Sequence, residues 1–368
     1  MNVPFFNLRR QYDNIKTEID TAFSDVLERT DFVNGKAITD FEKSFAEYNN
    51  VKHCSCVTNG TIALHLSLLA LGVSPGDEVI LPVNTFIATA EAVSHCGATP
   101  VFADVNEDDY CMDTESFKKA ITNKTKAVIP VHLYGHPVDI EELLNISLGH
   151  GIDVVEDCAQ AHGATVNGKK VGSFGKLGAF SFYPSKNLGA YGEGGAILTD
   201  DEELLLLIKK LKDHGSIQKH KHELVGYNYR MSGLQGASLS VKLKYLDEWN
   251  YRRIEIAHRY CKNLSDLPIK LQICQEGRKH VYHLLVAQVN DRNGVIDKLK
   301  QKGIGAGIHY MSPLHLTEAY NRIGYKKGDF PVAEEISDRI ISLPMFPELR
   351  NDEIDYVCYT LRDILNEK

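Results

Sequence analysis

One lysine, Lys186, follows a short apolar run and precedes a glycine-rich loop in the segment 178–195. A lysine amine attacks a carbonyl group only when it is unprotonated, and burial against apolar side chains lowers its pKa. The run 179–183 supplies such a wall, and Pro184 prevents the strand from continuing. The loop glycines that let backbone approach a bound group are Gly189, Gly192, Gly194 and Gly195. The segment predicts a lysine that forms a Schiff base with an aldehyde cofactor, although the same residues, taken alone, also describe a surface lysine after a core strand.

A second group of residues, Asn59, Gly60 and Thr61, lies where a strand passes into a helix. Gly60 can make the tight turn, and the amides of the first helical turn then point outward, where they can bind a phosphate with the Thr61 hydroxyl. This is not a Walker loop, because the Gly-Lys-Ser/Thr ending is missing, and no Gly-x-Gly-x-x-Gly follows the first strand. The turn is therefore a candidate phosphate site, with an ordinary capped turn as the alternative.

A third feature is the end of the apolar strand 153–156, where Asp157 follows Glu156. A carboxylate at this place can keep a pyridinium nitrogen protonated, and that charge turns the ring into an electron sink. Gln160, one turn further on, can hydrogen-bond a ring hydroxyl. Judged by itself, Asp157 is equally well explained as a strand-end residue that caps a helix.

The elements that must position these residues are short β-branched runs that alternate with helical patterns. The predicted strands are 54–57, 78–82, 100–103, 127–131, 153–156, 179–182 and 196–199, and the predicted helices include 61–71, 86–96, 114–121 and 140–150. Such alternation predicts an α/β fold with a mostly parallel sheet and helices on both faces. Ligands of such folds bind at the carboxyl ends of the strands.

The second part of the chain predicts a smaller α/β unit. A long helical pattern runs from 231 to about 264, strands are expected near 280–289 and 305–308, and a final helix has its N-cap at Asn351 or Asp352. With an N-terminal helix over 12–29, we expect a large domain of residues 1–245 and a small domain of residues 246–368, divided inside the long helix.

Composition excludes several classes of protein. The chain has 368 residues and a net charge of −8, which gives no support for nucleic-acid binding. No apolar run reaches the roughly 20 residues that span a bilayer, and the start lacks a signal-peptide core, so we expect a cytoplasmic protein without a membrane segment. The eight cysteines include no Cys-x-x-Cys pair and read as reduced thiols. His220 and His222 alternate with lysines that repel cations, so no metal site is expected.

Taken together, the phosphate turn, the acidic strand end and the sequestered lysine, in this order, resemble the sugar aminotransferases of the DegT, DnrJ, EryC and StrS family, which depend on pyridoxal 5'-phosphate (PLP). The resemblance covers nearly the whole chain. It implies the aspartate aminotransferase fold (fold type I), in which a large domain with a mostly parallel, mixed seven-stranded sheet is joined to a small α/β domain. It also implies that Lys186 forms the Schiff base and that Asp157 pairs with the pyridine nitrogen. The other cofactor contacts that it implies are Asn59, Gly60, Thr61, Phe86, Gln160, Ser181 and Asn228.

The same resemblance implies a substrate and an assembly. The segments 181–189 (Ser-Phe-Tyr-Pro-Ser-Lys-Asn-Leu-Gly) and 131–135 (Val-His-Leu-Tyr-Gly) are similar to those of family members that aminate 3-keto sugars. The substrate contacts would be Tyr183, Lys219, His309 and Tyr310. Asn228 would reach the phosphate bound by a neighbouring subunit, which implies a homodimer with shared active sites.

The resulting hypothesis is amino transfer from L-glutamate to C3 of a dTDP-linked 3-keto-6-deoxyhexose, through the pyridoxamine 5'-phosphate (PMP) form of the cofactor, for the biosynthesis of a surface polysaccharide such as O-antigen or of a glycoconjugate. The alternatives are a UDP-linked 3-keto hexuronate, a 4-keto nucleotide sugar, or a non-catalytic regulatory protein that keeps the fold. A sugar 3-dehydratase is disfavoured because that branch carries histidine where this chain has Lys186. A dinucleotide-binding dehydrogenase would need the glycine fingerprint that is missing here.

Overall fold

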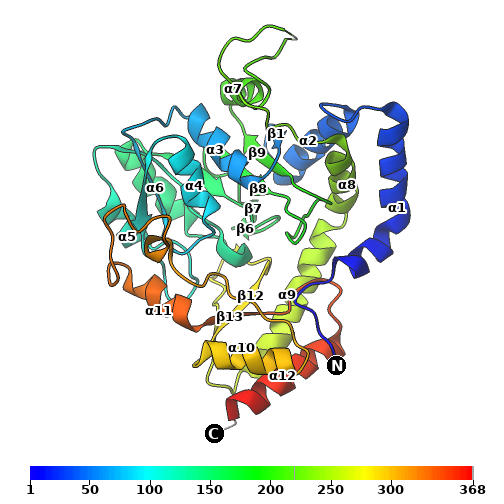
Figure 1. Cartoon of the computed structure of the whole chain (residues 1–368), viewed down its shortest axis with the longest axis vertical. Coiled ribbons are helices and arrows are strands. Elements are labelled where there is room, and N and C mark those ends of the chain that lie inside the picture. Colours follow the sequence, from blue (N-terminus) through cyan, green and yellow to red (C-terminus); the bar gives the residue numbers. More distant parts are fainter. Residues whose placement is uncertain (219, 367–368) are drawn as a thin grey trace.

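The computed structural model describes residues 1–218 and 220–366, and its centre is a seven-stranded sheet with the order β1-β9-β8-β5-β4-β2-β3 (Figure 1). The strands are β1 (His53–Val57), β2 (Glu78–Pro82), β3 (Thr99–Ala103), β4 (Thr125–Val128), β5 (Asp153–Asp157), β8 (Leu177–Ser181) and β9 (Gly195–Thr199). The pairs from β3 to β8 are parallel, whereas β9 runs antiparallel to both β8 and β1. The predicted α/β class with a mostly parallel, mixed sheet is confirmed, and each predicted strand is present within a few residues of its expected ends.

Helices cover the sheet in groups that pack against each other. They are α1 (Leu8–Arg29), α2 (Lys36–Asn49), α3 (Gly60–Ala70), α4 (Ala88–His95), α5 (Thr114–Ala120), α6 (Ile140–His150), α7 (Glu202–Lys212) and α8 (Gly233–Leu243). Helix α3 contacts α4 and α7, α5 contacts α6, and α2 lies between β1 and α8. Side-chain caps begin several of these helices, since Asn59, Asp113, Asp139 and Asp201 accept hydrogen bonds from amides of the first turn.

The prediction of one continuous helix from residue 231 to 264 is wrong. This part of the chain forms two helices, α8 and α9 (Leu246–Leu264). Between them the amides of Lys244 and Tyr245 bond to carbonyls three residues back, at 3.3 and 3.0 Å, and Tyr245 has a φ of −102°. These tighter bonds interrupt the α-helical ladder, so α9 starts anew and leads away from the large sheet (Figure 1).

A three-stranded sheet of β10 (Lys270–Leu271), β12 (Leu285–Gln288) and β13 (Ile340–Leu343) organises the C-terminal part, with α10 (Arg292–Gln301), α11 (Pro331–Arg339) and α12 (Asn351–Asn366). The strand expected over 280–289 is shortened to β12, and the one expected over 305–308 is wrong, because Gly307 makes only an isolated bridge to Ser342. Helix α12 already begins at Asn351, so neither predicted cap residue precedes it. Instead the Glu353 carboxylate accepts from the amide of Arg350 at 2.9 Å.

The smallest sheet and two short 3₁₀ helices complete the elements. The sheet consists of β6 (Thr165–Val166), β7 (Lys169–Lys170) and β11 (Arg278–Lys279), and the 3₁₀ helices are η1 (Leu133–Gly135) and η2 (Leu314–Leu316).

Two large clusters of buried apolar residues accompany the two larger sheets. The N-terminus belongs to the C-terminal cluster, because the amide of Val3 donates to the Gly303 carbonyl at 2.9 Å and the Val3 carbonyl accepts from Gly305 at 2.8 Å. Conversely, Leu314 and Phe330 pack in the cluster of the large sheet. A division near residue 245 remains a proposal, which the two clusters support. Within the described residues, no helix is both long and apolar enough to cross a membrane.

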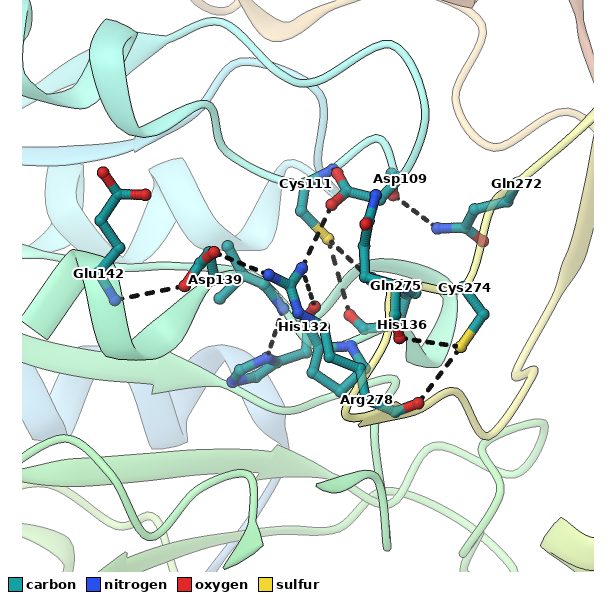
Figure 2. A network of polar contacts seen from close by, with 12 residues as sticks. Asp109, Cys111, His132, His136, Asp139, Glu142, Gln272, Cys274, Gln275 and Arg278 are labelled. Atoms are coloured by element: carbon teal, nitrogen blue, oxygen red, sulfur yellow. Dashed lines mark hydrogen bonds and ion pairs between the residues drawn. The ribbon is translucent and has the colours of Figure 1, made fainter. Parts of the chain in front are cut away.

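A polar network fastens the segment 272–279 to the large sheet (Figure 2). The Arg278 guanidinium donates to Asp139 at 2.8 Å and to the buried carboxylate of Asp109 at 3.4 Å. The Gln272 amide donates to the Asp109 carbonyl at 2.6 Å. Since this segment leads into β12, the network ties the two sheets together.

Candidate active site

A cavity of about 660 Å³ lies at the carboxyl ends of the strands, where the sequence places its chemical residues. The predicted site residues that line it are Asn59, Gly60, Thr61, Phe86, Asp157, Gln160, Ser181, Tyr183, Lys186, His309 and Tyr310. These residues come from turns far apart in the chain, so the fold brings the three sequence features into one space.

Lys186 occupies the turn that follows β8. Its amide donates to the Tyr183 carbonyl at 2.9 Å, and the amide of Ala190 donates to the Phe182 carbonyl at 2.8 Å, so the turn closes on the end of the strand. Surrounding protein lowers the pKa of the Lys186 amine to about 8, and the nearby Asp157 opposes this shift. The unprotonated amine, which nucleophilic attack on a carbonyl requires, is therefore far more abundant near neutral pH than in an exposed lysine.

Asp157 ends β5 on the floor of the cavity and is almost fully buried. One carboxylate oxygen accepts from the Thr89 hydroxyl at 3.0 Å and the other from the amide of Ala159 at 3.1 Å. Burial raises the pKa of Asp157, while these hydrogen bonds and the Lys186 charge pull it back down. The carboxylate is thus held in one orientation, ready to pair with a cation.

The phosphate turn packs directly on the strand that carries Ser181. Asn59 has an extended backbone, with φ −165°, and its side chain accepts from the amide of Ile62 at 3.0 Å, so it caps α3. A Cβ on Gly60 would lie 2.6 Å from the Ser181 Cβ, and one on Gly195 would lie 2.5 Å from the backbone of Asn59. Only glycines allow this close approach of turn, strand and loop.

The opposite wall comes from the C-terminal part of the chain. His309 Nδ1 and the Ser342 hydroxyl form a hydrogen bond of 2.8 Å, and burial near Lys186 lowers the pKa of His309 to about 4. The Gln160 amide donates to the Tyr310 hydroxyl at 3.1 Å. The Phe86 ring is half exposed and lies 5.8 Å from the Tyr310 ring, centroid to centroid. Tyr310 therefore contacts two residues predicted to hold the cofactor, Gln160 and Phe86, whereas His309 is held by Ser342.

One predicted residue does not join the cavity, and another lies outside the described residues. Asn228 does not line it, and its side-chain oxygen instead accepts from the Arg230 guanidinium at 2.6 Å. It lies in the segment after α7 and forms an isolated antiparallel bridge with Asp213, directly after that helix. Lys219 lies outside the described residues.

Sequence reasoning missed several residues that line the cavity, among them the polar side chains of Thr89, Glu193 and His283. Glu193 could have been predicted, because it is the one charged residue between Lys186 and β9. Nothing in the sequence around Thr89 or His283 marks them as site residues. They enter the site only because α4 and the segment before β12 fold against the sheet.

The residues present fit PLP. A helix N-terminus next to a serine forms a cradle that a Cβ on Gly60 would fill, which suits the phosphate. A carboxylate held by two hydrogen bonds suits the pyridine nitrogen, and an amine with a lowered pKa suits the aldehyde. All three groups line one cavity whose volume admits a molecule of this size.

Solved structures share this arrangement of the whole chain. A structure of S. venezuelae DesV in complex with a ketimine intermediate is 40% identical and superposes with a TM-score of 0.98, covering 100% of this chain and 99% of that one. The structure of NtdA from Bacillus subtilis with bound cofactor PMP is 31% identical, with a TM-score of 0.94, and covers 100% of this chain and 86% of that one.

Relatives with assigned names are similar over nearly their full length. The erythromycin biosynthesis sensory transduction protein EryC1 of Saccharopolyspora erythraea is 44% identical, covering 98% of this chain and 99% of that protein. The dTDP-3-amino-3,6-dideoxy-alpha-D-galactopyranose transaminase of Aneurinibacillus thermoaerophilus is 41% identical (96% and 97%). The UDP-N-acetyl-3-dehydro-alpha-D-glucosamine 3-aminotransferase of Acidithiobacillus ferrooxidans is also 41% identical (99% and 98%). The sequence profile of one family matches residues 13–362, and the chain belongs to that family, the DegT/DnrJ/EryC1/StrS aminotransferases.

Proposed function

We propose that the protein uses PLP to transfer an amino group from L-glutamate to C3 of a dTDP-linked 3-keto-6-deoxyhexose. The products would be a dTDP-3-amino-3,6-dideoxyhexose and 2-oxoglutarate, and we assign the amino sugar to the biosynthesis of a surface polysaccharide such as O-antigen or of a glycoconjugate. The observation that carries the proposal is the Lys186 amine, with its pKa lowered to about 8, in one cavity with Asp157 and the cradle of Gly60 and Ser181.

The residues of this chain divide the work of the reaction. When bound, PLP supplies an electron sink for the negative charge that develops at the carbon losing its proton. Asp157 stabilises the positive charge on the pyridine nitrogen, and its two hydrogen bonds keep the carboxylate directed at that position. Lys186 takes the Cα proton of L-glutamate, and in the second half-reaction it returns a proton to C3 of the sugar. The cavity wall of His309 and Tyr310 limits the access of water to these steps.

Two kinds of support favour a 3-keto sugar. The segment 181–189 is similar to that of family members that act on 3-keto sugars. The relatives from Aneurinibacillus thermoaerophilus and Acidithiobacillus ferrooxidans carry names that place the amino group at C3, one on a dTDP-linked and one on a UDP-linked sugar. The position on the sugar is thus better supported than the nucleotide, and a UDP-linked 3-keto hexuronate or a 4-keto sugar remains the alternative substrate.

The test is a panel of dTDP- and UDP-linked 3-keto and 4-keto sugars, generated in situ and incubated with the purified enzyme, PLP and L-glutamate. We expect amination of dTDP-linked 3-keto-6-deoxyhexoses, detected as the amino sugar by mass spectrometry. The Lys186→Ala variant should lose at least about 10³-fold in turnover, because it lacks the proton-transferring amine, and borohydride should no longer attach the cofactor at this position. Amination only at C4, or full turnover by the variant, would contradict the proposal.

A second candidate function is regulation without catalysis, because the EryC1 relative is named a sensory transduction protein. The two functions differ in their response to the amino donor. An aminotransferase purified with PLP is yellow and loses this colour when L-glutamate is added, as the cofactor takes up the amino group. A protein that keeps its absorbance under these conditions would be a regulator.

We further propose a cytoplasmic homodimer in which Asn228 reaches the cofactor phosphate of the neighbouring subunit. The position of Asn228 supports this, since it lies outside the cavity of its own chain and next to Arg230 in the segment after α7. The amide and the guanidinium are both suited to bind phosphate.

A further inference from the structure

His283 lines the cavity but has no part in the function proposed above. It lies in the segment between β11 and β12, and only 8% of its surface is exposed. Its single described hydrogen bond joins Nδ1 to the Asn187 side-chain oxygen at 3.2 Å. Asn187 follows Lys186 directly in the chain, so the imidazole is anchored to the loop that holds the reactive amine.

Backbone carbonyls determine which imidazole nitrogen carries the proton. The Asn187 amide nitrogen donates to the Val281 carbonyl at 3.0 Å and to the Asn250 side-chain oxygen at 2.8 Å. Asn250 is oriented in turn, because its amide nitrogen donates to the His162 carbonyl at 2.7 Å. The Asn187 oxygen therefore faces His283 and accepts from Nδ1–H, which leaves Nε2 of the neutral ring with a lone pair.

The ring stays neutral, and its lone pair is accessible. Burial and the nearby cations of Lys186 and Arg253 hold the pKa of His283 well below its usual range. Within the described chain Nε2 has no hydrogen-bond partner, yet it is not among the side-chain atoms that are both fully buried and unpaired. Nε2 thus presents a hydrogen-bond acceptor to the cavity, close to Lys186.

We propose that His283 Nε2 accepts a hydrogen bond from a hydroxyl group of the keto sugar and so positions the sugar carbonyl for amination. This inference rests on the proposed function and names a specificity-determining residue within it. The sugar brings neutral hydroxyl donors. L-glutamate brings two carboxylates, which are acceptors that a lone pair repels, and its amino group is the one that the reaction transfers. His283 therefore serves the half-reaction with the sugar and not the half-reaction with L-glutamate.

The test compares His283→Asn and His283→Gln in the two half-reactions, each followed by cofactor absorbance in single turnovers. Asparagine keeps a donor near the Nδ1 position for Asn187 but has nothing at Nε2, whereas glutamine reaches the Nε2 position with an amide oxygen. We expect His283→Asn to slow the sugar half-reaction about tenfold, the effect of one lost hydrogen bond. His283→Gln should stay within about threefold of the wild type, and both variants should react normally with L-glutamate. Calorimetry with the amino-sugar product should likewise give a larger Kd for His283→Asn than for His283→Gln, whose Kd should be close to that of the wild type.

His280→Gln is the matched control. His280 is buried in the same segment and bonds through Nε2 to Gln272 at 3.0 Å, but it does not line the cavity. This variant should lower the melting temperature without changing the ratio of the two half-reaction rates. A purely structural role for His283 predicts the reverse order of the variants, with asparagine better than glutamine, or an equal loss in both half-reactions, and either result would overturn the inference. A wild-type enzyme that aminates only 4-keto sugars contradicts the proposed substrate instead, and the order of the variants with that sugar still decides the role of His283.

Discussion

Lys186 and Asp157 influence each other's protonation across one cavity. Burial favours the neutral form of both groups, lowering the pKa of Lys186 and raising that of Asp157, while the opposite charge of each favours the ionised form of the other. The result is a site in which the amine changes its charge near pH 8, although an exposed lysine would do so near 10.5.

This balance predicts the pH dependence of cofactor attachment. Only the unprotonated amine attacks the aldehyde, so the rate at which cofactor-free enzyme forms its Schiff base with PLP should rise with pH and level off above about pH 8. Asp157→Asn removes the charge that raises the pKa of Lys186, and the midpoint should move to lower pH. Stopped-flow absorbance measures both profiles. A midpoint near 10.5 in the wild type, or an upward shift in the variant, would contradict the lowered pKa of Lys186 and the opposing effect of Asp157.

The start of α3 is the element on which phosphate binding depends. Gly60→Ala places a methyl group 2.6 Å from the Ser181 Cβ, and the helix must move away from the strand to admit it. We expect PLP to bind about tenfold more weakly, which corresponds to about 1.4 kcal/mol, as measured by equilibrium dialysis.

Gly149→Ala is the control for this change. Gly149 lies in α6, and nothing stands within 4 Å of the position of its Cβ. The substitution should leave PLP affinity unchanged and stabilise the protein by about 0.5–1 kcal/mol. Equal PLP affinities of the Gly60 variant and the wild type would contradict the cradle.

The network around Arg278 makes a prediction about stability. Arg278→Met leaves the buried Asp109 carboxylate without its cation, and burial already raises the pKa of that carboxyl. We expect a loss of about 3 kcal/mol in the free energy of unfolding, measured with urea at neutral pH. The contact with Asp139 adds little, because its side chain is 42% exposed.

Removing both partners should cost less than removing one. The double variant Asp109→Asn, Arg278→Met no longer buries an unpaired charge and should recover part of the loss. If the double variant is as unstable as the sum of the two single variants, Arg278 and Asp109 do not act as a pair. The same guanidinium explains why Asp109, Cys111 and His136, whose ligand-type atoms lie within 4.8 Å of one another, are a poor metal site.

At the level of elements, local patterns predicted most of the large sheet and little of the C-terminal part. The strands of the sheet are apolar and bounded by turn residues, so their types and places follow from sequence. The break between α8 and α9 does not follow from sequence, because Lys244 and Tyr245 are residue types that are common in helices. The break is favoured by tertiary contacts around Lys242, whose amine donates to the Gly189 carbonyl at 2.7 Å. His283 was missed for the same reason: a histidine before a strand gains its role from Asn187, which is far away in sequence.

The whole molecule makes a prediction about assembly. If two chains share their sites, a mixture of Lys186→Ala and Asn228→Ala subunits should form heterodimers in which one site has both Lys186 and Asn228. Each variant alone should be nearly inactive, and the mixture after refolding together should recover up to about a quarter of wild-type activity, the share expected for one intact site in half of the dimers. Sedimentation should give twice the monomer mass. Absence of recovery, with dimers present, would place Asn228 outside the partner's site.

The molecule as a whole also limits what a single sequence can reveal. The motifs predicted which residues of one chain meet in the cavity, because parallel strands end at a common edge. Asn228 lies outside this cavity, and the role proposed for it depends on a second chain, while His283 and Glu193 line the cavity although no motif marks them.

The hydrogen bonds of Val3 with Gly303 and Gly305 affect the order in which the protein folds during synthesis. Val3 is synthesised about 300 residues before its hydrogen-bond partners Gly303 and Gly305. The large sheet can form earlier, because its last strand ends at Thr199. Val3 therefore lacks these hydrogen bonds while the sheet assembles, and closing so long a loop is slow. Docking of Val3 therefore has to follow the synthesis of the segment 303–305.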